Sequence, residues 1–251
     1  MSIKRTIVSV LLSLVASLVA QEADSSTRAM LQYARGHQEF KEVYFKQHEE
    51  EFQRLVKQGQ APETLYIGCS DSRVVPNLIL GTKPGELFVI RTAGNFVPLY
   101  DEEADDGVSA TVQYAVEVVN VKHIIVCGHS HCGAIKGLYD PLDKKFAVLK
   151  RWLKWGEEAK AMALKTTNQK ASKEQIYKMT EQLSVIYQLK HILSFPYIKK
   201  RVEEGKLELH GWYYEIETGD LYFYECGSCS FQKATSPNVK ADWIKSAPAD
   251  K

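Results

Sequence analysis

Three short apolar runs constrain the fold of this chain most strongly, because each has the length and composition of a buried strand. They are TLYIGC (Thr64–Cys69), GELFVIR (Gly85–Arg91) and KHIIVCGH (Lys122–His129). A helix-like segment that opens at Asp105 and Asp106 separates the second run from the third. Strands that alternate with helices predict an α/β fold with a mainly parallel central sheet, flanked by helices on both faces.

Two further segments extend this central pattern at its ends. Lys206–Glu225 alternates apolar and polar residues on both sides of a Thr218–Asp220 turn, which predicts a C-terminal hairpin strand pair. Residues 27–57 intersperse aromatic side chains among charges and are typical of one or two surface helices. We therefore expect a single domain over residues 21–251, with residues 21–62 as an N-terminal helical arm.

The first twenty residues differ in composition from the rest of the chain. Lys4 and Arg5 precede an apolar run, Ile7–Val19, which ends at Ala20 before the polar QEADSS. A basic start, a short apolar stretch and a small final residue are typical of a secretory signal peptide. The run is shorter than the roughly 20 apolar residues of a membrane span. We expect residues 1–20 to be removed and the mature chain to be periplasmic or secreted, without stable membrane insertion.

The overall composition narrows the class of function. Hydrophobic residues make up 45% of the chain and charged residues 25%, which is typical of a globular protein that needs no disulfide framework. The formal net charge of +1 gives no electrostatic reason to expect a nucleic acid partner. Five cysteines, an odd number, suit an exported chain better if some of them bind a metal.

Two motifs place metal-binding side chains at the carboxyl ends of predicted strands. CSDSR begins at Cys69, and GHSHCGA contains His129 and Cys132. Ligands of parallel sheets bind beyond these strand ends, so we expect the three side chains to be neighbours. Two thiolates and one imidazole suit zinc and leave a fourth tetrahedral position open. Asp71 could fill that position or accept a hydrogen bond from bound water, and an ion pair with Arg73 would hold it off the metal.

Other interpretations of these cysteines stay open at this point. Cys127 lies within a predicted strand and is typical of a small buried hydrophobe. A structural zinc in a non-catalytic binding module is the main alternative, although such sites normally have four Cys or His ligands. Cys226 and Cys229 form a C-x-x-C pair, for which we expect a local disulfide or two thiols without a function.

Taken together, these motifs resemble the signatures of the β-class carbonic anhydrases. The segments that carry the resemblance are CSDSRV, GHSHCGA, KPGELFVIRTAGNFV (Lys83–Val97) and LHGWYYEIETG (Leu209–Gly219), and it covers roughly Lys41 to Glu225. The resemblance implies a zinc-dependent lyase that reversibly hydrates carbon dioxide to bicarbonate and a proton, with zinc-bound hydroxide as the nucleophile. It also implies a homodimer or larger homo-oligomer that exchanges N-terminal helices.

The resemblance also implies roles for individual residues. The zinc ligands would be one residue of the first motif and two of the second: Cys69, His129 and Cys132. Asp71 and Arg73 would orient the nucleophilic water, with Asp71 binding zinc only in a closed, inactive state. The substrate pocket would use a glutamine, two aromatic residues and the glycine after the last ligand: Gln60, Phe88, Tyr114 and Gly133. Core packing is the alternative role of the two aromatic residues.

One position of this sequence departs from the pattern of a subgroup of the family, and the substrate differs among members of the family. A subgroup of the family binds inhibitory bicarbonate through a Trp, an Arg and a Tyr. Arg91 and Tyr214 match two of these positions, but Tyr66 stands in place of the Trp, and this difference favours the plant-like form with an open zinc. Some relatives hydrolyse other small molecules such as carbon disulfide, which is the alternative substrate class.

Overall fold

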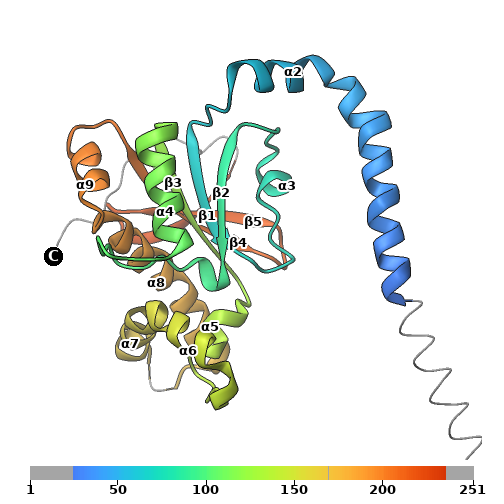
Figure 1. The fold of residues 1–251 in the computed structure, drawn as a ribbon. Coiled ribbons are helices and arrows are strands. Elements are labelled where there is room, and N and C mark those ends of the chain that lie inside the picture. The colour runs from blue at the N-terminus through green and yellow to red at the C-terminus, as the bar shows by residue number, and fades with distance from the viewer. Residues whose placement is uncertain (1–24, 169, 236–251) are drawn as a thin grey trace, which may run out of the picture. The chain divides into compact units, whose positions relative to one another are not determined.

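The structure is a computed structural model that describes residues 25–168 and 170–235 (Figure 1). The predicted signal peptide, residues 1–20, lies outside the described residues. The described residues divide into two compact units, one up to Gly59 and one from Gln60 onward. Within the described ranges, no helix combines the length and the apolar character needed to cross a membrane.

The first unit is helical, as the sequence predicts. Residues 25–39 form a helix that continues into a π-helical turn, η1 (Phe40–Phe45), and α2 (Glu49–Gln58) follows. Phe52 contacts Phe45 and Phe40, with ring centroids 5.0 and 6.1 Å apart. None of the residues of η1 and α2 is buried within this unit.

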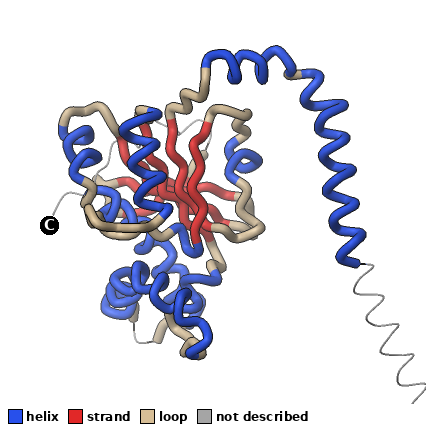
Figure 2. Tube along the Cα trace, in the orientation of Figure 1, coloured by secondary structure: helices blue, strands red, loops and turns tan. Residues whose placement is uncertain are grey.

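One sheet forms the centre of the second unit. Its strands within the described residues are β1 (Thr64–Cys69), β2 (Leu87–Thr92), β3 (His123–His129), β4 (Glu208–Glu215), β5 (Asp220–Glu225) and β6 (Ser230–Lys233). They lie in the order β2-β1-β3-β4-β5-β6, and the strands appear red in Figure 2. The first four strands are parallel, and β5 and β6 add antiparallel pairs. The mainly parallel sheet and the C-terminal hairpin are thus confirmed, whereas β6 was not predicted.

Helices connect and flank these strands. They are α3 (Pro76–Leu80), α4 (Gly107–Gln113), α5 (Gly133–Gly137), α6 (Ala147–Leu153), α7 (Glu157–Thr166), α8 (Lys173–Leu193) and α9 (Pro196–Glu203). Shorter helical turns are η2 (Ala93–Asn95), η3 (Tyr114–Val119), η4 (Lys144–Phe146) and η5 (Lys154–Gly156). The local sequence explains where two of these helices begin. Asp106 accepts hydrogen bonds from two backbone N–H groups at the start of α4, and Ser172 and Gln175 form a capping box at the start of α8.

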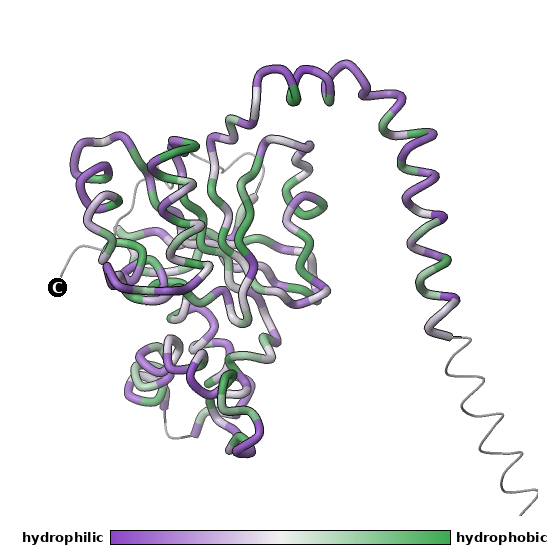
Figure 3. The backbone as a smooth tube through the Cα atoms, viewed as in Figure 1, coloured by the Kyte–Doolittle hydropathy of each residue, from purple (hydrophilic) through white to green (hydrophobic). Residues whose placement is uncertain are grey.

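The main core lies between one face of the sheet and helices α4, α8 and α9. Leu65, Ile67, Ile124 and Val126 project from that face and pack among helix residues such as Leu189. The opposite face carries a smaller cluster around Tyr66, Ile125 and Cys127, against which Leu80 of α3 packs. Apolar residues concentrate on β1, β2 and β3, where Figure 3 shows stretches of green. This two-sided burial fixes the strand ends from which the functional side chains project.

Candidate metal centre

Three potential metal ligands converge at the carboxyl ends of two neighbouring strands. Cys69 is the last residue of β1, His129 is the last residue of β3, and these strands are paired in parallel. Cys132 follows His131, whose φ of 56° turns the chain so that α5 can begin at the next residue, Gly133. All three side chains are buried, and their ligand atoms lie within 4.8 Å of one another. The fold thus brings the two motifs together, as the sequence predicts.

The imidazole of His129 is oriented in the way a metal ligand requires. Its Nδ1 lies 2.8 Å from the carbonyl oxygen of Ser130, to which it donates. The carbonyl contact fixes the tautomer, so Nε2 carries a lone pair. That Nε2 is buried without a hydrogen-bond partner among the described residues. Because a buried polar atom normally has a partner, this nitrogen fits a metal ion.

The two thiols are coupled through their contact with each other. The hydrogen bond from Cys132 lowers the pKa of the Cys69 thiol, and the same contact raises the pKa of Cys132 well above its ordinary value. Burial among Phe96, Ile135 and Leu138 adds to the cost of a second negative charge. Both thiols can therefore ionise together only beside a cation, as two thiolate ligands of zinc would.

Gly94 in η2 brings the backbone against the sulfur of Cys69. Its N–H donates to Sγ of Cys69 at 3.4 Å, and the N–H of Asp71 donates to the same sulfur at 3.4 Å. A Cβ at position 94 would lie 2.8 Å from Cζ of Phe96 and 2.9 Å from Cβ of Ala134. The φ of Gly94 is +82°, so both space and backbone conformation require glycine here.

Asp71 and Arg73 form an ion pair beside the three potential ligands. Arg73 donates from Nε to Oδ1 at 2.9 Å and from Nη2 to Oδ2 at 2.8 Å. These hydrogen bonds hold the pKa of the Asp71 carboxyl well below its usual range. The cluster of converging ligand atoms contains Cys69, His129 and Cys132 but not Asp71. The carboxylate therefore faces the arginine in this structure.

Arg91 has a positioning role that the sequence did not reveal. Its guanidinium donates to the carbonyl oxygens of Cys69 at 2.9 Å, Asp71 at 2.7 Å and Val74 at 2.6 Å. Three contacts from one side chain on β2 fix the loop that follows β1. The sequence related Arg91 only to an inhibitory bicarbonate site, and Tyr66, at another position of that site, is buried.

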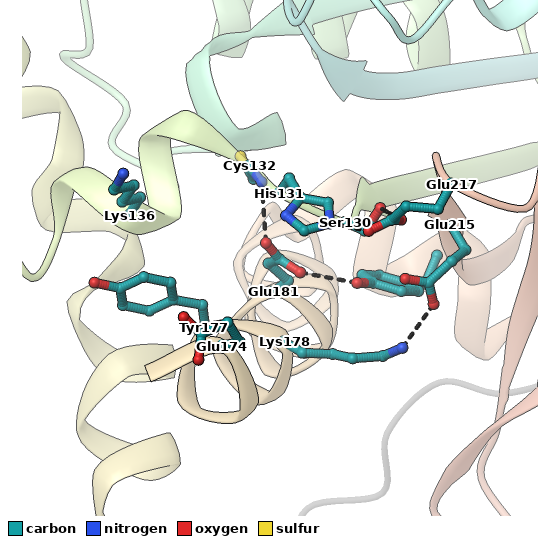
Figure 4. Close-up of a pocket in the computed structure, with 11 residues that line it drawn as sticks. Ser130, His131, Cys132, Lys136, Glu174, Tyr177, Lys178, Glu181, Glu215 and Glu217 are labelled. Atoms are coloured by element: carbon teal, nitrogen blue, oxygen red, sulfur yellow. Dashed lines mark hydrogen bonds and ion pairs between the residues drawn. The ribbon is translucent and has the colours of Figure 1, made fainter. Parts of the chain in front are cut away.

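Glu181 of α8 holds the backbone of Cys132 through a hydrogen bond, as Figure 4 shows. Its Oε1 accepts the backbone N–H of Cys132 at 3.0 Å, and its Oε2 accepts the hydroxyl of Tyr213 at 2.8 Å. Burial raises the pKa of this carboxyl. The sequence pattern that could have identified Glu181 is its position on the buried stripe of this helix, which also carries Val185 and Ile192.

The pocket in Figure 4 is lined in part by Glu181 and Cys132 and has a charged lining. Its residues come from α8, α5 and the loop before it, and the end of β4 with the turn that follows: Ser130, His131, Cys132, Lys136, Glu174, Tyr177, Lys178, Glu181, Tyr213, Glu215 and Glu217. Lys178 forms an ion pair with Glu215 at 2.6 Å. Of the three potential ligands only Cys132 lines this pocket, and Asp71 does not line it.

Of the four residues expected in the substrate pocket, three lie away from the ligands of their own chain. Gln60 is exposed and precedes β1, so the whole strand separates it from Cys69. Phe88 is paired with Leu65, about 13 Å along the sheet from the position of Cys69. Tyr114 stacks on Phe88 with ring centroids 5.8 Å apart. Gly133 does adjoin Cys132, and a Cβ there would meet nothing within 4 Å.

Comparison with known proteins places this geometry in a family. The profile of the carbonic anhydrase family matches residues 64–221. A carbonic anhydrase of Synechocystis sp. is 40% identical over 78% of this chain and 71% of its own. A carbonic anhydrase of Pseudomonas aeruginosa is 44% identical over 72% of this chain and 82% of its own.

Solved structures agree with the sequence comparisons. The β-carbonic anhydrase CcaA superimposes with a TM-score of 0.77 at 39% identity, over 82% of this chain and 92% of its own. A tetrameric β-carbonic anhydrase of Sordaria macrospora has a TM-score of 0.67 at 32% identity, over 78% of this chain and 98% of its own.

Proposed function

Because the chain belongs to the β-class carbonic anhydrases, it is a lyase that interconverts carbon dioxide and bicarbonate, and we propose that Cys69, His129 and Cys132 hold its zinc ion. The observation that carries this proposal is the buried, unpartnered Nε2 of His129 beside two thiols. When bound, zinc supplies a Lewis acid that makes water easier to deprotonate near neutral pH.

Asp71 is proposed to orient the attacking water. Arg73 engages both carboxylate oxygens and keeps the group ionised. Oδ1 accepts from Nε and from the backbone N–H of Arg73, whereas Oδ2 accepts only from Nη2 and retains a lone pair for a hydrogen bond from water. Accepting that hydrogen bond would turn a lone pair of the water oxygen toward the carbon of carbon dioxide. The backbone contacts of Arg91 and Glu181 would keep the loops on both sides of this water in place.

A second copy of the chain is proposed to complete the substrate pocket. Phe88 lies on β2, the edge strand of the sheet, and Tyr114 beside it is 45% exposed. A half-buried Phe88 beside an exposed Tyr114 at a sheet edge is suited to an interface, where the pair would offer an apolar surface to carbon dioxide bound in the neighbouring subunit. On this proposal a homodimer is the smallest complete enzyme, and Gln60 and Phe88 serve the partner's site.

Export is proposed from residues 1–20 alone. Their basic start, apolar run and small last residue support removal after Ala20 and a periplasmic or secreted enzyme. The test is cell fractionation followed by N-terminal sequencing of the recovered protein. A mature chain that begins at Gln21 supports export, and an intact N-terminus in the cytoplasm refutes it.

Stopped-flow hydration of carbon dioxide with a pH indicator tests the proposed site. The parent enzyme is assayed beside Cys69→Ser, with zinc content measured on both. We expect fast hydration and one tightly held zinc in this site for the parent, and loss of both in the variant. Hydration that persists in a variant without this zinc would refute the ligand assignment. A zinc-loaded parent that is inactive would favour the structural role of zinc.

A further inference from the structure

A second cluster of metal-binding side chains lies at the amino-terminal ends of β3 and β4, whereas the zinc centre lies at the carboxyl ends of β1 and β3. His123 and Glu208 are the first residues of β3 and β4 and are direct partners in the strand register. His210 lies two residues further along β4. Because a strand rises about 3.3 Å per residue, His123 is about 20 Å along β3 from His129. The cluster is therefore independent of the proposed active site.

The strand geometry points the three side chains at one another. Residues 208 and 210 are two apart on β4 and project from the same face, which is also the face of their neighbour His123. Nδ1 of His123 lies 3.2 Å from Nε2 of His210 and 3.5 Å from Oε2 of Glu208. One ligand atom from each residue lies within 4.8 Å of the others.

These separations match those within a metal coordination sphere. With metal–nitrogen bonds of about 2.0 Å, neighbouring ligands of a tetrahedral zinc ion are about 3.3 Å apart. The distances from Nδ1 of His123 to the other two ligand atoms, 3.2 and 3.5 Å, bracket that value. Two imidazoles and one carboxylate are also a donor set that suits zinc and neighbouring first-row ions.

One residue of the cluster is buried and the other two are partly exposed, so an ion can enter from the solvent. His210 is buried at 5% exposure, whereas the side chains of His123 and Glu208 are 36% and 33% exposed. The inner ligand is thus held by packing, and the outer two face an adjoining pocket that Asn120 and Gly205 help to line. Solvent can reach the cluster from that side and supply the remaining ligand.

The cations around this pocket already have acceptors. Those that line it beside the two outer ligands are Lys122, Arg201 and Lys206. Lys122 pairs with Glu63, and Lys206 pairs with Glu204 at 2.9 Å. The Arg201 guanidinium donates to the carbonyl oxygens of Val116 and Val121. Their charge is therefore partly offset, and the carboxylate of Glu208 remains available to a cation.

We propose that His123, Glu208 and His210 form a second divalent-metal site, selective for zinc-like first-row ions, that links β3 to β4. Its remaining coordination positions face the solvent-accessible pocket. The site adds a second ion per chain to the one held by the two cysteines and His129. A plain hydrogen-bonded histidine pair is the competing interpretation, and it predicts no second ion.

Metal stoichiometry of the full chain tests the proposal. Protein stripped of metal is loaded with excess zinc, freed of unbound ion by gel filtration, and analysed by mass spectrometry for zinc per chain. We expect two zinc ions in the parent and one in His123→Gln and in Glu208→Gln. His37→Gln, which removes an exposed histidine of the N-terminal helix, should keep two. Far-UV circular dichroism verifies that each variant is folded.

Cobalt distinguishes the two sites by their ligands. A Cys69→Ser, Cys132→Ser double variant should still bind one cobalt ion, with visible ligand-field bands but without thiolate-to-cobalt charge transfer. One zinc per parent chain, a second zinc that persists in His123→Gln, or a double cysteine variant that binds no cobalt would each overturn the proposal. The parent stoichiometry decides the question even where a variant fails to fold.

Discussion

Arg73 holds Asp71 through two parallel hydrogen bonds, from Nε to Oδ1 at 2.9 Å and from Nη2 to Oδ2 at 2.8 Å. The planar guanidinium matches the carboxylate, which explains why the pKa of Asp71 lies well below its usual range. The same Nη2 donates to the carbonyl oxygen of His131 at 3.1 Å. The ion pair thus also ties the first metal-binding motif to the second.

Replacing Asp71 by asparagine should remove most activity without removing the metal. An amide would turn its NH2 group toward the Arg73 guanidinium or toward the water, and one hydrogen-bond acceptor would be lost. We expect kcat to fall by about 100-fold, the lower range for a positioned proton acceptor. Stopped-flow hydration and zinc analysis measure the two effects separately. Asp105→Asn, an exposed acid, is the matched control. Unchanged kcat in Asp71→Asn would exclude the proposed role.

Gly94→Ala should destabilise the metal centre more than an ordinary glycine substitution. The left-handed conformation alone costs an alanine about 1–2 kcal/mol in free energy of unfolding. The contact with Phe96 and Ala134 should add about 1–3 kcal/mol. Gly81→Ala is the matched control, because its φ is +63° and a Cβ there meets nothing within 4 Å. Equal losses for both variants in urea unfolding would show that the clash is relieved without cost.

Glu181→Ala should lower stability by leaving two buried donors without a partner. The Cys132 N–H and the Tyr213 hydroxyl both donate to this carboxylate, and each unsatisfied group costs about 1–3 kcal/mol. We expect a loss of about 2–6 kcal/mol in free energy of unfolding, with weaker zinc retention during dialysis against a chelator. Glu181→Gln, which keeps an acceptor for Cys132, should lose much less. A Gln variant as unstable as Ala would show that the charge is what matters.

Cys127 should resist alkylation where Cys229 reacts. Burial raises the pKa of the Cys127 thiol to about 12, so at pH 8 only about one molecule in 10,000 carries the reactive thiolate. Because the pKa is raised, the thiolate fraction and the rate of alkylation increase only as the pH approaches that value. Burial also limits access of the reagent to the sulfur. Cys229 is exposed at the turn between β5 and β6. Mass spectrometry after brief iodoacetamide treatment should find Cys229 modified and Cys127 modified only in denaturant. Early labelling of Cys127 in the folded enzyme would contradict this burial.

The strands could be predicted because their signal is local. The apolar run Thr64–Cys69 coincides with β1, and the second and third runs differ from β2 and β3 by one or two residues at their ends. Helix α9, which begins at Pro196, was not predicted, although a proline commonly marks a boundary just after the end of a helix. Proline also occupies the first position of helices, where its missing N–H costs nothing.

The identity of the potential zinc ligands was also available from the sequence. Cys69 and His129 each end an apolar strand, and the ends of parallel strands meet at one edge of the sheet. The turn that carries Cys132 back to them needs only three residues. The structure adds the buried, unpartnered nitrogen of His129 and the distances between the ligand atoms.

The sequence by itself determined the strands, the parallel sheet and the chemical type of the centre, because residue spacing along one element dictates which side chains share a face or an end. Only the tertiary structure decided which distant residues support that centre and which form the second cluster. Glu181 lies 49 residues from Cys132, and His210 lies 87 residues from His123. Such contacts depend on strand order, helix packing and register over the whole unit, and no local pattern in the sequence records them.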